Sequence, residues 1–385
     1  MQSLTQKLGA PPVLPSVKKS PSLRELSLTI TVATPMAGGG VEAGKIDERR
    51  PVRVPSIKGH LRYWWRMMNK DSPGKSARES EIWGSTEKPG KVYVDVPKQP
   101  SVLLRYCDKN FEFSRYGPEN YALFSSLPTR DKPGNNIAHE NFSFTIKLTY
   151  PQEFHDDIIY SLSAWLYFGG LGSRTRRGCG SLSCNEVPVS LHEILKSAPY
   201  ITLWRKKAHD SLAAWSYAVK RYKDYRQARN KGEGPRLGRS KWPEPDSLRQ
   251  ITGRSSVRHR TPITSPLPSF PRAALGMPII FHFIDRDDPH DTTLIPGLKD
   301  SSRMASPVIT KALCENGTWY SAVVILPHDN VFDVPLKLDG VNREYRIPSR
   351  KGAIYSRTQP MQGKLDAISG FEEFISGDFR KETAR

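Results

Sequence analysis

The sequence predicts an α+β fold, because stretches with strand periodicity and stretches with helical periodicity are both pronounced and follow one another in a mixed order. Apolar and polar residues alternate over residues 25–33 and 142–148, as in strands with one buried face. Apolar residues recur at helical spacing over residues 57–69 and 154–168. These four segments predict that helices pack on a sheet in the first half of the chain.

The order of the elements in this half indicates a topology. The first strand stops at Thr34-Pro35, the first long helix begins after Pro55-Ser56, and Gly169-Gly170 ends the second long helix. Further predicted elements are a short helix at 79–83, a strand at 91–96, a loop-rich section to about residue 140 and a strand at 181–187. The order strand, helix, strands, helix, strand fits a ferredoxin-like βαββαβ unit with insertions.

Two apolar strands at residues 278–284 and 319–326 indicate a second α+β unit. Before them, residues 200–260 hold 16 Lys or Arg against 5 Asp or Glu, a net charge of +11. One helix is predicted in this stretch from Leu212, Trp215, Val219 and Tyr222, and a flexible basic loop at 230–241. The predicted division is a flexible tail at 1–22, an N-terminal domain at 23–197, a basic aromatic connector or insertion at 198–262 and a C-terminal domain at 263–385.

The composition restricts the partners. The 385 residues include 58 Lys and Arg against 39 Asp and Glu, a net charge of +19. The commonest polyanionic partner of such a protein is nucleic acid. The four scattered cysteines form no CxxC pair, and no apolar run approaches the ~18–20 residues of a membrane span. We therefore expect a cytoplasmic protein with no membrane partner, structural metal or cofactor.

The most informative segment is a glycine-rich loop with three arginines. Its G-x-G-x5-G-x-G frame comprises Gly170, Gly172, Gly178 and Gly180, with Gly169 before it and Arg174, Arg176 and Arg177 inside it. Glycines allow positive φ and close approach of a phosphodiester, and guanidinium groups bind its oxygens. The alternative is a structural helix-to-strand turn whose arginines are merely solvated.

Two other basic segments are candidate RNA contacts. Residues 50–66 place Lys58 and Arg62 on the helix at 57–69, opposite Trp64 and Trp65, which we expect in the core. In residues 200–260, bases could stack on Trp204, Tyr222 or Trp242, unless the segment is only a connector or a partner-docking element.

The evidence for catalysis is weak. The acidic run at 285–291 has the composition of a metal site, but a solvated loop is the better interpretation. His60 has the chemistry of a general base, although a histidine on a helix surface is more often inert. No serine–histidine–acid frame is present.

Several blocks together resemble the RAMP superfamily of CRISPR-associated proteins, and within it the subunits of the type III-B Cmr effector complex. The matching blocks are Thr34-Pro35 with Gly38-Gly39, residues 55–59 and 61–66, Glu81–Ser85, residues 168–178, Trp242–Glu244, residues 270–276 and Arg303–Pro307.

This resemblance implies two ferredoxin-like, RRM-like domains and a non-catalytic subunit at the 3′-end side of the CRISPR RNA (crRNA). The partners implied are crRNA, target RNA and other Cmr RAMP subunits. It assigns RNA contacts to Lys58, Arg62, Arg174, Arg176 and Arg177, and more weakly to Arg50 and Arg53. Glu42 is the only acid in the loop at 35–44, which agrees with the absence of nuclease activity. The alternatives are a metal-independent RAMP endoribonuclease that uses His60, and a protein-docking scaffold without RNA contacts.

Overall fold

The computed structural model describes residues 22–107, 117–230, 238–262, 268–341, 343–346, 360–361 and 363–383. The predicted tail at 1–22 therefore lies outside the described residues, except for Ser22. Most of the predicted basic loop at 230–241 does so as well. The observed mixture of helices and antiparallel sheets confirms the α+β class.

The first sheet has the strand order β3-β6-β1-β7, and all its pairings are antiparallel. Its strands are β1 (Leu23–Val32), β3 (Tyr93–Asp95), β6 (Phe142–Pro151) and β7 (Leu182–Ser183). β1 and β6 pair along their whole length, from Leu23 opposite Pro151 to Val32 opposite Phe142. The predicted strands are confirmed, although the one expected at 181–187 has only two residues.

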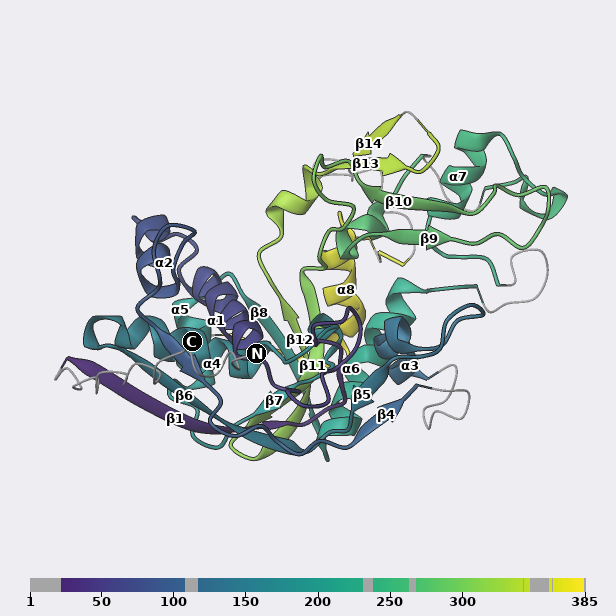
Figure 1. Ribbon diagram of the computed structural model, residues 1–385. Helices are drawn as coiled ribbons and strands as arrows, with labels where there is room; N and C mark the ends of the chain where they lie inside the picture. The colour runs from purple at the N-terminus through teal and green to yellow at the C-terminus, as the bar shows by residue number, and fades with distance from the viewer. Residues whose placement is uncertain are drawn as a thin grey trace, which may run out of the picture.

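Helices α1 (Val54–Met68) and α4 (His155–Phe168) pack against each other and against this sheet (Figure 1). α1 buries Ile57, Leu61, Trp64 and Trp65, which lie on one face at helical spacing. This confirms the expected position of both tryptophans in the core. α4 ends at Gly169, as predicted.

The second sheet has the order β11-β12-β8-β15 and is also antiparallel. Its strands are β8 (Thr202–Ala208), β11 (Val308–Glu315), β12 (Thr318–Ile325) and β15 (Arg380–Glu382). Helix α6 (Ser211–Arg226) packs on β11 and β12, and α8 (Ala367–Ser376) contacts α6. β8 and α6 thus lie in the expected connector and yet build the second sheet and its cover. The boundaries of the predicted division stay a prediction.

Two smaller sheets and the remaining helices complete the described part of the fold. One sheet, β2-β5-β4, consists of Met36–Ala37, Asn136–Ala138 and Leu104–Tyr106. The other, β14-β13-β10-β9, consists of Glu344–Arg346, Pro335–Leu338, Thr292–Pro296 and Ile279–Phe281. The helices are α2 (Lys75–Trp83), α3 (Pro118–Leu123), α5 (Leu191–Ser197) and α7 (Glu244–Thr252). The 3-10 turns are η2 (Phe124–Ser126), η3 (Gln152–Phe154), η4 (Thr175–Arg177), η5 (Val257–His259), η6 (Pro271–Leu275) and η7 (Asp329–Phe332).

The two strands predicted at 278–284 and 319–326 are present as β9 and β12, but they lie in different sheets.

β11 joins the two halves of the molecule. Residues 308–313 are all buried, and the strand contacts α4 and β7 on one side and α6 on the other. A strand covered on both faces is normally apolar throughout. Lys311 is an exception, because it lies on this strand with no exposed surface.

Within the described ranges, the structure contains no helix that has both the length and the apolar character of a membrane span.

Candidate nucleic-acid interface

The glycine-rich loop runs from the end of α4 through η4 to β7 and adopts the backbone that its glycines predict. Gly172, Gly178 and Gly180 have φ of +85°, +72° and +65°. A Cβ on Gly172 would lie 2.7 Å from the Ala37 carbonyl oxygen, so a larger residue does not fit. The loop amides bond inside the protein: Ser173 N donates to Ala37 O (2.6 Å) and Gly180 N to Pro35 O (2.9 Å). These amides do not form the phosphate cradle that the sequence suggested.

Gly169 and Gly170 are tightly packed at the start of this loop. A Cβ on Gly169 would meet the rings of Trp165 and Trp64, and one on Gly170 would lie 2.9 Å from the Gly180 carbonyl oxygen. Both glycines are therefore required by packing.

Arg177 is buried, with 8% of its surface exposed. Its guanidinium donates to Val308 O (2.8 Å) and to the hydroxyl of Tyr222 (2.7 Å), and lies 3.8 Å from the centre of the Tyr222 ring. Burial lowers the pKa of Arg177. These contacts give Arg177 a structural role inside the protein, so its predicted RNA contact is disfavoured and stays a prediction.

Arg174 and Arg176 are partly exposed but also bond within the chain. Arg174 has a positive φ of 59°, and its side chain donates to the carbonyls of Ala122 (2.8 Å) and Tyr121 (2.9 Å). Arg176 donates to the Ser306 carbonyl and to the Tyr63 hydroxyl (3.1 Å). Of the two readings of this loop, the geometry favours the structural one, although its arginines are bonded inside the protein and not merely solvated. Their RNA contacts stay a prediction.

Two of the other blocks that carry the resemblance, Trp242–Glu244 and residues 270–276, contact each other and helix α6. The Arg272 amide donates to Glu244 (2.7 Å), which links the block at 270–276 with Trp242–Glu244. Arg226 of α6 donates to the carbonyls of Leu275 (2.7 Å) and Gly276 (2.9 Å). These two blocks therefore pack in the second core, beside α6.

Lys58 and Arg62 lie away from the glycine-rich loop, in a groove of about 660 Å³. The groove is on the N-terminal unit, by which we mean the first sheet with helices α1 and α4. The groove is bounded by α1, the end of α2, the turn at 84–90 and the start of β3. Its lining residues are Lys58, Arg62, Trp83, Gly84, Ser85, Thr86, Lys88, Pro89, Gly90, Val92 and Tyr93. Three cations and no carboxylate line it. We name it the cationic groove.

The cationic groove keeps a net positive charge. Glu79, which lies outside the lining, accepts from Arg66 (2.5 Å) and Arg62 (2.5 Å). Hydrogen bonds from Arg66 and Arg62 hold the pKa of Glu79 below its ordinary value. One carboxylate thus serves two guanidiniums and neutralises only half of their charge. In the part of the chain that the structure describes, neither Lys58 nor Lys88 has an ion-pair partner.

Two residues of this groove, Lys88 and Tyr93, were not among the sequence candidates. Lys88 precedes Pro89-Gly90 in a turn, and Tyr93 begins the edge strand β3 with 71% of its surface exposed. A lysine in a Pro-Gly turn beside an aromatic edge strand is the signal that could have found them.

The weaker candidates Arg50 and Arg53 differ in position. Arg50 is exposed, and its RNA contact stays a prediction. Arg53 donates to the carbonyls of Gly39 (3.3 Å) and Gly40 (3.1 Å), and so supports the turn after β2.

The proposed stacking surface at 200–260 is largely internal. Tyr222 and Trp242 are buried, with 0% and 1% of their surface exposed, and therefore cannot stack on bases. Trp204 is partly exposed, and its indole donates to Glu372 (3.0 Å). The prediction for Tyr222 and Trp242 is wrong, because both rings pack in the second core.

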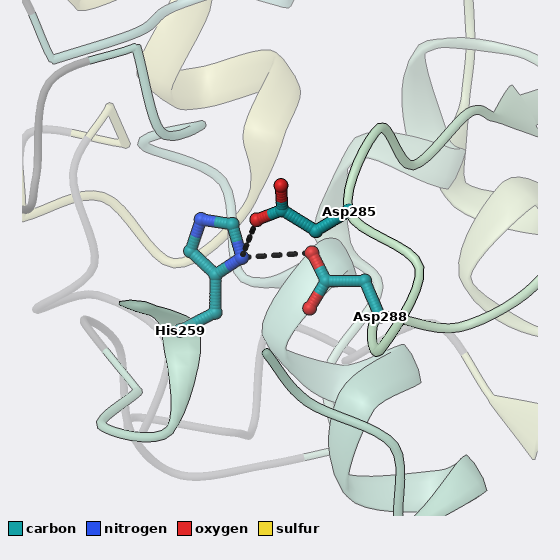
Figure 2. A group of neighbouring side chains, drawn as sticks. All are labelled: His259, Asp285 and Asp288. Atoms are coloured by element: carbon teal, nitrogen blue, oxygen red, sulfur yellow. Dashed lines mark hydrogen bonds and ion pairs between the residues drawn. The ribbon is translucent and has the colours of Figure 1, made fainter. Parts of the chain in front are cut away.

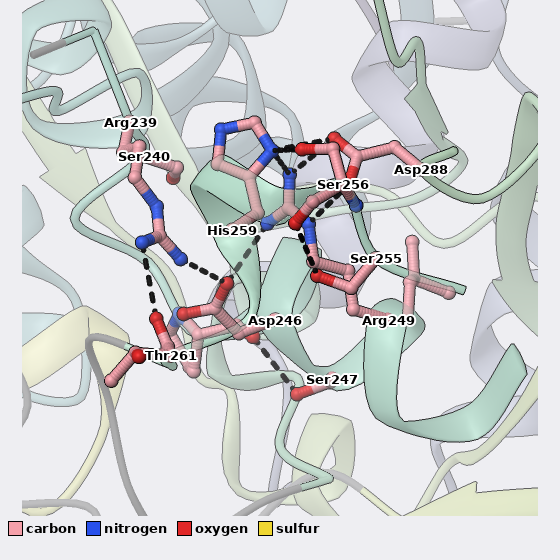
Figure 3. A network of polar contacts seen from close by, with 12 residues as sticks. Arg239, Ser240, Asp246, Ser247, Arg249, Ser255, Ser256, His259, Thr261 and Asp288 are labelled. Carbon is pink, nitrogen blue, oxygen red and sulfur yellow. Dashed lines mark hydrogen bonds and ion pairs between the residues drawn. The ribbon is translucent and has the colours of Figure 1, made fainter. Parts of the chain in front are cut away.

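The acidic run at 285–291 is not entirely a solvated loop. Asp288 is buried, with 3% exposed, and its carboxylate lies 2.7 Å from His259 Nδ1, with Asp285 also near that nitrogen (Figure 2). Arg249 donates to Asp288 Oδ2 (2.8 Å) and its terminal nitrogen lies 3.1 Å from the same histidine nitrogen (Figure 3). Because the Arg249 guanidinium already bonds to both oxygens of the Asp288 carboxylate, we interpret the cluster as a salt-bridge network. The network ties α7 and η5 to the turn at 285–291.

Replacing Asp288 by asparagine should destabilise the protein at neutral pH and much less in acid. Burial favours the neutral form, but hydrogen bonds from Arg249, Ser256 and His259 outweigh it and hold the pKa of Asp288 well below its ordinary value. A depressed carboxyl pKa contributes stability above the unfolded pKa of ~3.9 and loses it as the pH falls below that value. Urea unfolding of wild type and D288N from pH 7 to pH 2 measures this, because the contribution is lost progressively below pH ~3.9 toward the lower pKa of the folded protein. Curves that stay parallel over this range would contradict the ion-pair account.

Part of the chain matches the model of a known superfamily of proteins. Residues 29–183, from β1 to β7, match the model of the RAMP superfamily. This range includes both the glycine-rich loop and the cationic groove. The predicted resemblance to the RAMP superfamily is therefore confirmed for this part of the chain.

Two individual matches point to one kind of RAMP protein, the Cmr subunits. The CRISPR system Cmr subunit Cmr1-1 of Pyrococcus furiosus is 29% identical over 143 residues, which cover 34% of this chain and 40% of that protein. The sequence match thus spans less than half of that relative. The apo crystal structure of Cmr1 from P. furiosus aligns with a TM-score of 0.51 at 18% identity, over 93% of this chain and 98% of that one. The protein resembles a Cmr RAMP subunit in sequence over about a third of its length and in fold over nearly its whole length.

Proposed function

We propose that this protein is a non-catalytic RNA-binding subunit of a type III-B CRISPR (Cmr) effector complex. In this proposal it contacts crRNA, target RNA or both at the crRNA 3′-end side, beside other RAMP subunits. The observation that carries the proposal is the cationic groove, with three cations and no lining carboxylate, inside the part of the chain that matches the RAMP superfamily. The name of the P. furiosus relative, a Cmr subunit, supports the choice of complex.

We also propose that each large sheet belongs to a ferredoxin-like domain. In the first, β1, α1, β3, β6, α4 and β7 follow one another in the chain and the sheet order is β7-β1-β6-β3. In the second, β8, α6, β11, β12, α8 and β15 follow in the same way, with the order β15-β8-β12-β11. The same βαββαβ connectivity in both halves supports the proposal.

The geometry does not favour the endoribonuclease alternative. His60 lies against Trp165, with their ring centres 6.1 Å apart, and burial lowers its pKa to about 4. A general base works best when its pKa is near the working pH, so His60 is a poor one at neutral pH. Cys179 is buried, and burial raises its pKa to about 12, which excludes a thiolate nucleophile there.

RNA binding by the purified chain should depend steeply on salt. Three phosphate contacts on single-stranded RNA give a log–log slope of about −2, or a ~20-fold loss of affinity between 50 and 200 mM salt. Fluorescence anisotropy with a labelled single-stranded RNA, at four salt concentrations, measures the slope. The same samples, run on a denaturing gel with and without magnesium, should contain intact RNA.

Each alternative has its own outcome in this experiment. Affinity that is absent or independent of salt would favour the docking scaffold. RNA cleavage that persists through repurification and stops in H60A would favour the nuclease.

A further inference from the structure

We propose that the cationic groove binds one unstacked nucleotide of single-stranded RNA, with its phosphate at the cations and its base against Tyr93. This inference rests on the proposed function and adds a ligand class and two residues, Lys88 and Tyr93. The groove has the size of a small-molecule site, since its volume of about 660 Å³ falls within the usual range of ~300–1,000 Å³.

The groove combines two kinds of surface. Lys58, Arg62 and Lys88 supply positive charge, while the exposed residues Pro89 and Tyr93 supply apolar surface beside the buried Trp83 and Val92. A simple polyanion site needs only the charges. A nucleotide has both a phosphate and a flat apolar base, so it matches the two together.

The exposed side chain of Tyr93 is the second observation that supports a nucleotide ligand. Its ring is 71% exposed on the edge strand β3, where packing in the core does not account for it. Aromatic side chains that line a basic groove provide stacking platforms for unpaired bases. A base inside a duplex is already stacked on both faces, so a groove of this kind selects single strands.

The groove is formed before any ligand arrives, because the turn at 84–90 is closed by its own hydrogen bonds. Ser85 N donates to Lys88 O (2.8 Å), and the amide of Lys88 donates to Ser85 Oγ (3.2 Å). The residues after the turn bond back to α2, with Lys91 N donating to Glu81 O (3.1 Å) and Val92 N to Ile82 O (3.2 Å). A preformed site avoids the entropic cost of ordering a loop on binding.

The test uses the full chain and compares a ten-nucleotide oligouridine, a ten-base-pair RNA duplex and heparin. We expect Y93A to weaken binding of the oligouridine by about 5- to 100-fold, the usual range for loss of one stacked base, and to change duplex and heparin binding less than about twofold. K88A should weaken binding of all three probes and reduce the magnitude of the log–log salt slope for the oligouridine by ~0.7. Y93F should bind like wild type.

Matched controls lie away from the groove. Tyr106 is an exposed tyrosine of β4, and Lys337 is an exposed lysine of β13. Y106A and K337A should bind the oligouridine within about twofold of wild type. Thermal midpoints of all variants should equal that of wild type, because the replaced side chains are exposed.

The outcomes separate this inference from the proposed function. If wild type binds RNA with a steep salt dependence while Y93A and K88A bind equally well, the groove inference is wrong and the proposed function stands. If Y93A weakens duplex, heparin and single strands alike, nucleotide stacking is wrong. If wild type binds no RNA, the proposed function itself fails. Photocrosslinking of 4-thiouridine RNA to wild type needs no variant. A crosslink within residues 83–93 or 58–62 supports the inference, and crosslinks confined to segments outside the groove overturn it.

Discussion

Replacing Gly178 by valine should destabilise the protein by about 3–5 kcal/mol, a large part of the usual stability of a folded protein. Gly178 has φ of +72°, which a β-branched residue adopts only under strain. A Cβ at this position would also lie 2.7 Å from the Thr310 carbonyl oxygen and 2.9 Å from Lys311 Cα. Both atoms belong to the backbone of β11 and cannot move aside alone. Urea unfolding measures the loss.

A second glycine variant separates the effect of backbone strain from the effect of the close contact with β11. Gly253 ends α7 with a similar φ of +68°, but a Cβ there meets no atom within 4 Å. G253V should therefore cost only the backbone strain, about 1–2 kcal/mol. Equal losses in G178V and G253V would show that the close contact with β11 is unimportant.

Replacing Lys311 by methionine should remove a pH dependence of stability that wild type has above neutral pH. Lys311 is fully buried, and its ammonium group donates to the carbonyls of Gly169 (2.9 Å) and Leu166 (3.3 Å) at the end of α4. Burial lowers the pKa of Lys311 to about 7, from an ordinary value of 10.5.

The sign of the effect follows from the two pKa values. Between pH 7 and 10.5 the unfolded chain holds the proton and the folded chain releases it, so wild type gains stability as the pH rises through this window. Relative to K311M, the gain from pH 7 to pH 10 should approach roughly 4 kcal/mol. Urea unfolding of both proteins at each pH unit measures it. K337M, which replaces an exposed lysine, should run parallel to wild type, and a parallel curve for K311M would contradict the prediction.

These two residues meet at the same place. Gly178 and Lys311 both lie where the glycine-rich loop touches β11, and the Trp215 indole of α6 donates to the carbonyl of Arg177 (2.7 Å) there. The loop therefore belongs to the contact between the two halves of the molecule. Substitutions in the loop should lower the stability of the folded protein, and any loss of RNA binding should follow from that destabilisation.

Local patterns were sufficient for the elements of the N-terminal unit. The alternation in β1 and β6, the helical spacing in α1 and α4, and the glycine at the end of α4 are short-range signals, and all these elements are confirmed. The positive φ of Gly172 and Gly178 belongs to the same class, because glycine is the residue that adopts such a backbone without strain.

Whether each basic side chain faces solvent was decided by tertiary structure alone. Arg177 and Lys58 are both cations next to a glycine in the sequence, yet Arg177 is buried against β11 and Lys58 lines a groove. The difference arises from β11 and Tyr222, which lie far from the loop in sequence and cover Arg177 in space. The place of β8 in the second sheet likewise depends on pairing with β12, more than a hundred residues later.

The sequence by itself determined the α+β class, the main helices and strands of the N-terminal unit, the glycine-dependent backbone of the loop and the resemblance to RAMP proteins. Each of these depends on residue type and spacing within a few turns or strands. Only the tertiary structure decided that the loop arginines bond inside the protein, that Lys311 is buried, and that Lys58, Arg62, Lys88 and Tyr93 share one groove. The physical reason is that burial and charge neutralisation depend on which distant segments come together, and local periodicity carries no information about that.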